Sequence, residues 1–205
     1  MDTHLKIIAG LGNPEERYAR TLHNAGFWFV DAVASSERGE FRYEKRFDAA
    51  VCKIALAGND VWLVKPQSYM NLSGGPIRAI LDYYRLSVES LLVAHDEIDL
   101  PPGVVRLKKG GGPGGHNGVR DTIRHCGSDF MRLRLGVGHP GTSDKVTDYV
   151  LKQGPADVEA AVTKAIASAI EVLPLLAERG LSIAMNRLHT RTDEDESAGA
   201  GKNGN

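Results

Sequence analysis

Five polar residues of this chain stand where a side chain can meet a substrate: His23, Asp96 and the asparagines Asn13, Asn71 and Asn117. Together they include neither a nucleophile nor a recognisable set of metal ligands. Such a set can hydrolyse an activated bond, for example an ester, by directing a water molecule at it. Each member also has an ordinary structural explanation, because asparagine and aspartate begin turns and cap helices and a lone histidine can simply fill space.

The elements that must position these residues alternate along the chain. Apolar runs bounded by turn residues predict strands at residues 5–11, 50–56, 61–65, 91–96, 104–108 and 132–138. Apolar residues at three- and four-residue spacing predict helices at residues 26–35, 75–84, 119–125 and 156–176. Interleaved strands and helices indicate an α/β fold, and two continuous apolar runs, LKIIAGL and LLVAHD, indicate central strands covered on both faces.

The candidate residues follow the predicted strands or begin a helix. Ligands of open α/β sheets gather outside the carboxyl ends of the strands. Asn13 follows the first strand, Asn71 lies in PQSYMNLSGG after the third, Asp96 ends the fourth, and Asn117 closes the glycine loop GGGPGGHNG. His23 falls at the start of the helix predicted from residue 26. We therefore expect the five side chains to converge.

The motifs argue against four familiar kinds of site. The glycine loop has no Lys-Ser/Thr after it, as a P-loop requires, and GLGNPEE lacks the third glycine of a dinucleotide fingerprint. GLSIA, at residues 180–184, is the nearest approach to a serine nucleophile elbow, but it lacks the final glycine and follows no strand. Metal ligation by His95, Asp96, Glu97 and Asp99 is disfavoured because adjacent strand residues point to opposite faces.

Length and composition favour one soluble domain. The chain has 205 residues, of which 42% are hydrophobic, and no linker divides it. From Arg191 onward the apolar periodicity stops, so we expect one folded domain over residues 1–190 and a disordered acidic, glycine-rich tail over residues 191–205. Neither a secretory signal nor a membrane-spanning run is recognised, and the two cysteines are far apart, so we expect a cytoplasmic protein without a disulfide.

The net charge of −1 hides a basic segment. Residues 101–145 carry eight Lys or Arg against three acids, a local balance of +5. A surface of this charge suits nucleic-acid phosphates, although any one of these residues can equally be a solvated surface charge.

Six motifs in register resemble those of the bacterial-type peptidyl-tRNA hydrolase family. They are GLGNP, HNAGF, KPQSYMNLSGG, HDEIDLPPG, GGGPGGHNG and RLRLGVGHPG, and the likeness extends from about Leu5 to His189. The resemblance implies a monomeric enzyme, a single domain with a twisted mixed β-sheet flanked by helices. It also implies the reaction: cleavage of the ester between a peptide and the 3′ end of tRNA, which recycles tRNA from abandoned translation, with no cofactor and no metal.

The resemblance also assigns roles to residues. It implies that His23 is the general base, that Asp96 orients it, and that Asn71 stabilises the carbonyl or oxyanion. A histidine suits this task because the pKa of free imidazole is about 6.5. The substrate-binding residues implied are Asn13, Tyr18, Met70, Asn117, Gly114 and Gly115. We expect the basic segment to contact acceptor-stem phosphates through Lys108, Lys109, Arg132, Arg134 and Lys145.

The chain departs from the family pattern at four positions. Leu22 stands where the family usually has Arg, Pro113 replaces a frequent His in the glycine loop, and Ser68-Tyr69 replaces the usual Thr-Phe. None of these changes removes a catalytic group. Two other readings stay open at this stage: an RNA-binding module without catalysis, and an amidase acting on small molecules.

Overall fold

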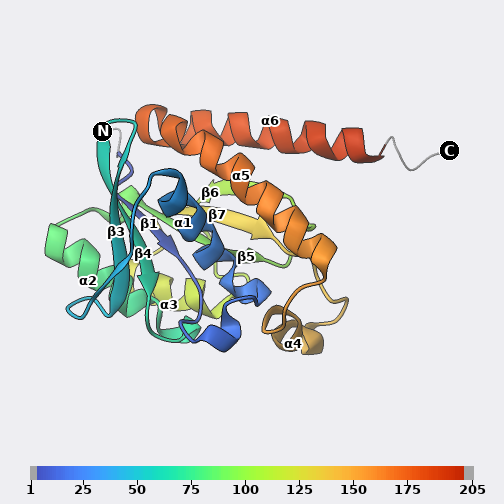
Figure 1. Cartoon of the computed structure of the whole chain (residues 1–205), viewed down its shortest axis with the longest axis horizontal. Coiled ribbons are helices and arrows are strands. Elements are labelled where there is room, and N and C mark those ends of the chain that lie inside the picture. The colour runs from blue at the N-terminus through green and yellow to red at the C-terminus, as the bar shows by residue number, and fades with distance from the viewer. Residues whose placement is uncertain (1–3, 201–205) are drawn as a thin grey trace.

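The computed structural model describes residues 4–200, with side chains described through residue 190. One mixed sheet of seven strands forms its centre (Figure 1). The strands are β1 (Ile7–Gly10), β2 (Arg42–Glu44), β3 (Ala49–Leu56), β4 (Asn59–Pro66), β5 (Leu91–Glu97), β6 (Val105–Lys109) and β7 (Met131–Gly136). Their order across the sheet is β2-β3-β4-β1-β5-β7-β6. The prediction of a single α/β domain with a mixed sheet is confirmed.

The four central strands are parallel and the flanking strands are antiparallel. β1 lies between β4 and β5, and β5 pairs with β7, all in parallel. β2, β3 and β6 run antiparallel to their neighbours. Because parallel strands end at one edge of a sheet, the loops after β1, β4 and β5 meet there, which brings together segments more than eighty residues apart.

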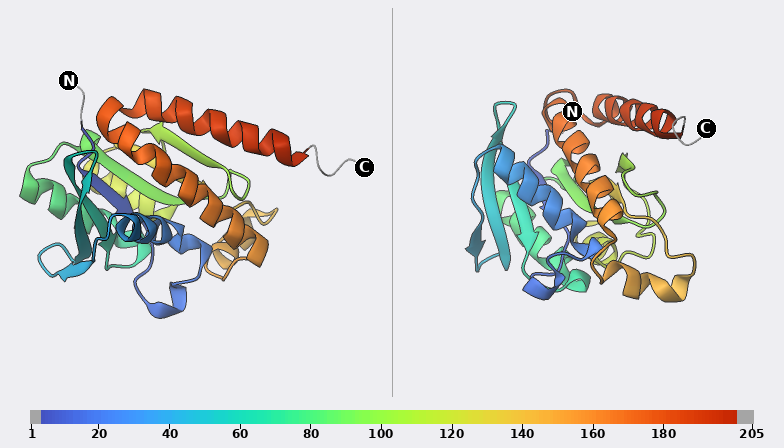
Figure 2. Two further views of the ribbon diagram at one scale, coloured as in Figure 1. Left: turned by 45° about the horizontal axis from the view of Figure 1, so that its top comes forward. Right: turned by 45° about the vertical axis from the view of Figure 1, so that its right-hand side comes forward.

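Helices cover both faces of the sheet. The helices are α1 (Ala25–Ser36), α2 (Gly74–Tyr84), α3 (Asn117–Cys126), α4 (Val146–Val150), α5 (Ala156–Arg179) and α6 (Leu181–Ala200). Apolar residues of α1, α5 and α6 form one core cluster with the sheet, and those of α2 and α3 form the other. Figure 2 shows α5 beside α1 on one face, with α6 running back across the end of α5.

Helix α5 is long and apolar enough to cross a membrane by length and composition alone. Its apolar stripe is instead buried against the sheet: Val162, Ile166, Ala169 and Leu173 are between 0% and 4% exposed. This is the packing expected of a core helix, as the sequence pattern predicts.

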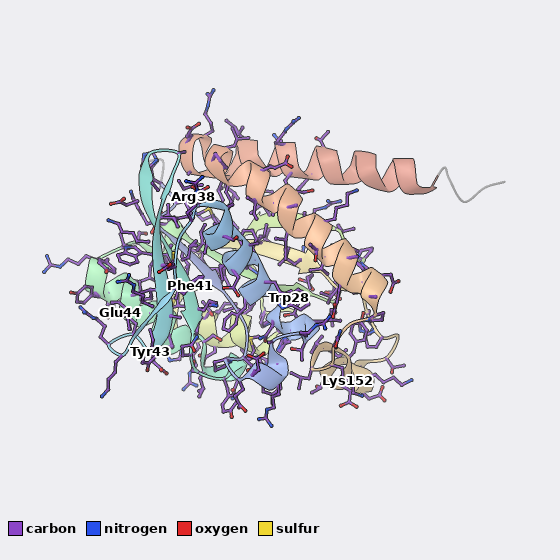
Figure 3. All side chains as sticks on the ribbon, in the orientation of Figure 1. Trp28, Arg38, Phe41, Tyr43, Glu44 and Lys152 are labelled. Carbon is purple, nitrogen blue, oxygen red and sulfur yellow. The ribbon has the colours of Figure 1, made fainter. Side chains whose placement is uncertain are left out.

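Three elements were not predicted from the sequence. β2 is a three-residue edge strand whose Tyr43 is 58% exposed, and Figure 3 shows Tyr43 and Glu44 at the outer rim of the molecule. α4 is only five residues long. α6 continues as a helix to Ala200, so the structure differs from the expected disorder over residues 191–200. No proline interrupts residues 191–200. The rest of the predicted tail, residues 201–205, lies outside the described residues. The domain boundary at residue 190 stays a prediction.

The start of α1 lies directly on the ends of β1 and β5. A Cβ atom at Gly26 would stand 2.3 Å from the carbonyl oxygen of Ala94 and 2.4 Å from the backbone nitrogen of Leu11. A Cβ atom at Gly10 would stand 2.2 Å from the carbonyl oxygen of Gly26. Only glycine permits this approach, which sets how far the residues just before α1 reach over the sheet.

Candidate active site

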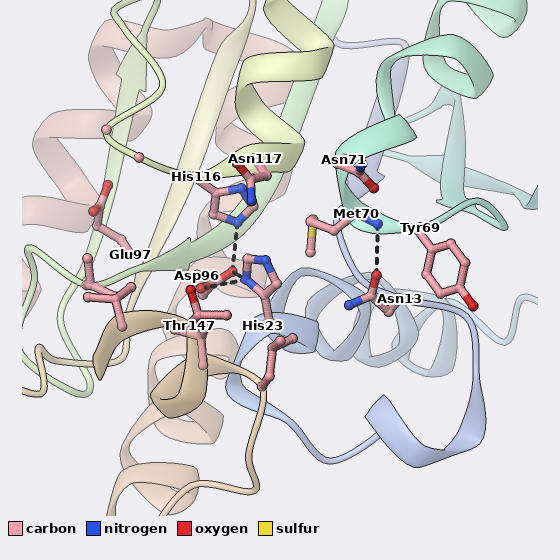
Figure 4. A pocket seen from close by; sticks show the side chains of 16 residues that line it. Asn13, His23, Tyr69, Met70, Asn71, Asp96, Glu97, His116, Asn117 and Thr147 are labelled. Atoms are coloured by element: carbon pink, nitrogen blue, oxygen red, sulfur yellow. Dashed lines mark hydrogen bonds and ion pairs between the residues drawn. The ribbon is translucent and has the colours of Figure 1, made fainter. Parts of the chain in front are cut away.

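A pocket of about 340 Å³ opens at the carboxyl edge of the parallel strands (Figure 4). All five candidate residues line it, so the predicted convergence is observed in the structure. The lining residues that sequence reasoning named are Asn13, His23, Met70, Asn71, Asp96, Gly114, Gly115 and Asn117.

His23 and Asp96 form a buried hydrogen-bonded pair. His23 lies in the short 3₁₀ turn η2 (Leu22–Asn24) that precedes α1, and Asp96 lies near the end of β5. The Nδ1 atom of His23 is 2.9 Å from Oδ1 and 3.0 Å from Oδ2 of Asp96. Because a carboxylate only accepts hydrogen bonds, Nδ1 carries the proton, and Nε2 of a neutral imidazole is left as an acceptor.

The electrostatics of the pair suit a general base. Burial alone would lower the pKa of His23, but the charge of Asp96 and its hydrogen bond outweigh burial, so the pKa lies above its usual value. Burial likewise would raise the pKa of Asp96, yet the two neighbouring imidazoles, His23 and His116, hold it well below its usual range. Asp96 is therefore ionised at neutral pH, and the pair keeps one defined tautomer.

His116 is a second partner of Asp96 that sequence reasoning missed. Its Nε2 atom donates to Oδ1 of Asp96 over 2.8 Å, and its Nδ1 atom accepts from the backbone N–H of Val119 over 3.3 Å. The rings of His23 and His116 have centroids 4.7 Å apart. The signal was present in the sequence, since His116 immediately precedes Asn117 in the glycine-loop motif, but loop residues carry no periodicity that would aim the ring.

The same three side chains are the group among the described residues whose ligand atoms converge as metal ligands would. Ligands of a tetrahedral zinc ion at about 2.0–2.1 Å stand roughly 3.3 Å from one another. The nitrogen–oxygen distances here are 2.8–3.0 Å, which are hydrogen-bond lengths. The donor set therefore fits a carboxylate bonded directly to two imidazoles better than a metal centre.

Asn13 is held by two other residues. The side chain of Asn24 accepts from the Asn13 backbone N–H over 2.8 Å and donates to its carbonyl oxygen over 3.0 Å. The Asn13 side-chain oxygen in turn accepts from the backbone N–H of Met70 over 2.8 Å. Asn24 makes no side-chain cap on α1, although asparagine beside a helix start suggests one. It instead fixes the loop after β1 against the turn that carries His23.

Asn71 and Asn117 line the pocket as predicted, whereas Tyr18 does not. Asn71 lies in the 3₁₀ turn η3 (Met70–Leu72) and Asn117 is the first residue of α3, so both approach the pocket from the α2–α3 face. Tyr18 is absent from the described pocket lining, and its ring packs against the guanidinium of Arg17, 4.8 Å from the ring centroid. Tyr69 lines the pocket instead.

An apolar wall of the pocket also escaped prediction. It comes from Ile98, Val146, Val150 and Leu151, that is, from the loop after β5 and from α4 with its following residue. The five-residue helix is too short for a periodic pattern to reveal it.

The residues predicted to contact phosphates differ in their exposure and in whether an acidic side chain pairs with them. Arg132 is 3% exposed: its guanidinium donates to Nε2 of His95, over 3.1 and 3.2 Å, and to the carbonyl oxygen of Gly112, over 2.7 Å. A side chain buried in this way does not present its charge to a phosphate, so Arg132 leaves the expected phosphate-binding set. Lys109 pairs with Glu89 over 3.0 Å and Arg134 with Glu97 over 2.8 Å, while Lys145 is exposed in the turn before α4.

Comparison with known proteins gives a consistent result. A family model described as peptidyl-tRNA hydrolase matches residues 7–196. The peptidyl-tRNA hydrolase of Nitrosomonas europaea is 47% identical over 94% of this chain and its own full length, and that of Xanthomonas axonopodis is 48% identical over 92% of this chain and 98% of its own. The crystal structure of the enzyme from Acinetobacter baumannii superposes with a TM-score of 0.89 at 40% identity, covering 92% of this chain and 96% of that chain. The chain belongs to the peptidyl-tRNA hydrolase family.

Proposed function

We propose that this enzyme hydrolyses the ester between the peptide and the 3′ end of tRNA in peptidyl-tRNA, with His23 as the general base. The single observation that carries the assignment is the bond from His23 Nδ1 to buried Asp96, which leaves Nε2 as a proton acceptor on the pocket side. His23 takes a proton from water as the water oxygen attacks the ester carbonyl. The imidazolium then returns the proton to the ribose oxygen as the carbon–oxygen bond breaks.

The remaining pocket residues hold the substrate in this proposal. Asn71 donates to the carbonyl oxygen and stabilises the negative charge that develops there, while Asn13 and Asn117 bind neighbouring acceptor groups. Met70, Gly114 and Gly115 line the same pocket. The peptide packs against the apolar wall from Ile98 and α4, which excludes water from that side of the ester.

Lys108 and Lys145 are the residues we propose for contact with acceptor-stem phosphates, supported by Lys109 and Arg134 once their carboxylate partners exchange for phosphate. Such contacts add affinity without reading base sequence, which suits an enzyme that accepts many tRNAs. We propose that the protein acts in the cytoplasm as a monomer, without a cofactor or metal, to return tRNA to translation.

One assay tests this function against its alternatives. Wild type and His23→Ala are each incubated with peptidyl-tRNA, free aminoacyl-tRNA and a peptide amide, and product release is measured. We expect turnover of peptidyl-tRNA alone and a loss of about 10²- to 10⁴-fold in the variant, since that is the usual contribution of a general base. Binding without turnover by wild type would indicate an RNA-binding module, and cleavage of the amide would indicate an amidase.

A further inference from the structure

The side chain of Asn117 is bonded to a residue that no role described so far uses. Arg120 lies three residues further along α3, about one helical turn, where side chains share a face. Its Nη1 atom is 2.6 Å from the Asn117 side-chain oxygen. An arginine donates hydrogen bonds and accepts none, so the amide oxygen of Asn117 must face Arg120 and its NH₂ group must face the other way.

The direction of an asparagine amide decides what it can bind. Its two ends have nearly the same shape, yet one only accepts hydrogen bonds and the other only donates them. Figure 4 shows the Asn117 nitrogen on the side of the amide nearer to His23, with the oxygen turned away.

We propose that Arg120 is a positioning residue that locks the Asn117 amide with its NH₂ group toward the pocket. Asn117 then recognises a hydrogen-bond acceptor of the substrate, such as a peptide carbonyl or a ribose oxygen. This inference rests on the proposed function for the identity of the substrate, but the locked amide itself is a property of the free protein.

Asn13 shows the same arrangement by a different route. Its side-chain oxygen accepts from the backbone N–H of Met70 over 2.8 Å, so its NH₂ group is likewise the end left for a ligand. Two amides of the pocket lining, one from the loop after β1 and one from the start of α3, are thus turned the same way by protein donors. The pocket selects a substrate segment rich in acceptors, which is what a peptide backbone next to an ester provides.

Arg120 is exposed, so its effect lies in orientation rather than in fold stability. Without Arg120 the amide is free to turn, and part of the population offers an oxygen where the substrate also has an oxygen. A neutral hydrogen bond lost in this way lowers kcat/KM by about 2- to 12-fold.

The test uses Arg120→Met with Arg124→Met as its matched control. Arg124 is exposed one turn further along α3, and its loss changes the net charge equally. We expect a loss of several fold in kcat/KM for Arg120→Met and none for Arg124→Met. Asn117→Asp is expected to lose as much as Asn117→Ala, because its carboxylate still pairs with Arg120 but has no proton to donate. Arg120→Met placed on Asn117→Ala is expected to add no further loss.

Two readouts separate orientation from a simple phosphate contact. If Arg120 bound a phosphate, its removal would flatten the logarithmic salt dependence of tRNA binding by about one unit, and its effect would add to that of Asn117→Ala. Either result overturns the proposal.

A measurement without substrate keeps the inference independent of the proposed function. In ¹⁵N-labelled protein, the side-chain NH₂ signal that disappears in Asn117→Asp is expected to shift in Arg120→Met and to stay in place in Arg124→Met. An unshifted signal in Arg120→Met contradicts the locked amide even if peptidyl-tRNA is turned over normally. Absence of wild-type turnover would instead contradict the proposed function and leave the NMR test decisive for Arg120.

Discussion

Replacing Gly26 with alanine is predicted to displace helix α1 and, with it, His23 in the active site. The new Cβ atom would stand 2.3 Å from the Ala94 carbonyl oxygen, whereas ordinary contacts begin at 3.4 Å. Relief of this overlap requires α1 to retreat by about 1.1 Å, the difference between those two distances. His23 lies three residues before Gly26, so it moves with the helix and stretches its 2.9 Å bond to Asp96 beyond hydrogen-bond range.

Two quantities are expected to change together. Overpacking of this kind costs about 1–3 kcal/mol, which for a domain of this size lowers Tm by roughly 2–12 °C. A displacement of the base by about 1 Å lowers kcat/KM on the order of 10²-fold. Differential scanning calorimetry and peptidyl-tRNA turnover measure the two effects on the same preparation.

Gly75→Ala is the matched control. Gly75 is the second residue of α2, and a Cβ atom there would meet nothing within 4 Å. The control is expected to keep full activity and to gain up to about 1 kcal/mol of stability from the higher helix propensity of alanine. If Gly26→Ala matched the control in Tm and turnover, the claim that this contact sets the position of His23 would be refuted.

Four further outcomes are expected. Protonated His23 cannot act as a base, so kcat/KM is expected to fall on the acid side through a pKa above the ordinary imidazole value. Asp96→Asn removes the charge that raises the pKa of His23, so it should move the acid limb of the pH–rate profile to lower pH and reduce the maximal rate by up to about 10⁴-fold. An acid limb that does not move would argue against the pairing of His23 with Asp96. Lys108→Ala and Lys145→Ala are expected to raise KM with little change in kcat, and to flatten the salt dependence of tRNA binding by about one unit each; two unchanged slopes would place the acceptor stem elsewhere. Truncation after His189 should leave Tm and turnover nearly unchanged, because Leu188, the last buried apolar side chain that the structure describes, is retained; a large drop in Tm would show that the end of α6 stabilises the fold.

Strand patterns were the most predictable part of this fold. The buried runs ending at Gly10 and Glu97 stand out because central parallel strands are apolar on both faces. β2 and α4 were missed because a three-residue strand and a five-residue helix contain too few residues for any period to appear. The end of α6 was misjudged because helices of polar composition show no apolar stripe.

The candidate site was predictable in its residues but not in its bonds. Strand-end position singled out Asn13 and Asp96, which do line one pocket. The sequence contains no indication that Asp96 bonds two imidazoles, since the second comes from a glycine loop whose conformation depends on tertiary contacts. The burial of Arg132 could not be predicted from the sequence either. Alternation along β7 indicates to which face of the sheet a side chain points, but not whether another element covers that face.

The placement of β1 at the centre of the sheet has a consequence for synthesis of the protein. During synthesis β1 lacks both of its neighbours until β4 and β5 follow, and the pocket lining extends to Leu151. Nascent chains that end before Leu151 therefore lack part of the pocket. A hydrolase of peptidyl-tRNA is itself attached to tRNA by the same ester while it is being made. Such an incomplete copy therefore lacks part of the pocket with which it would hydrolyse its own ester.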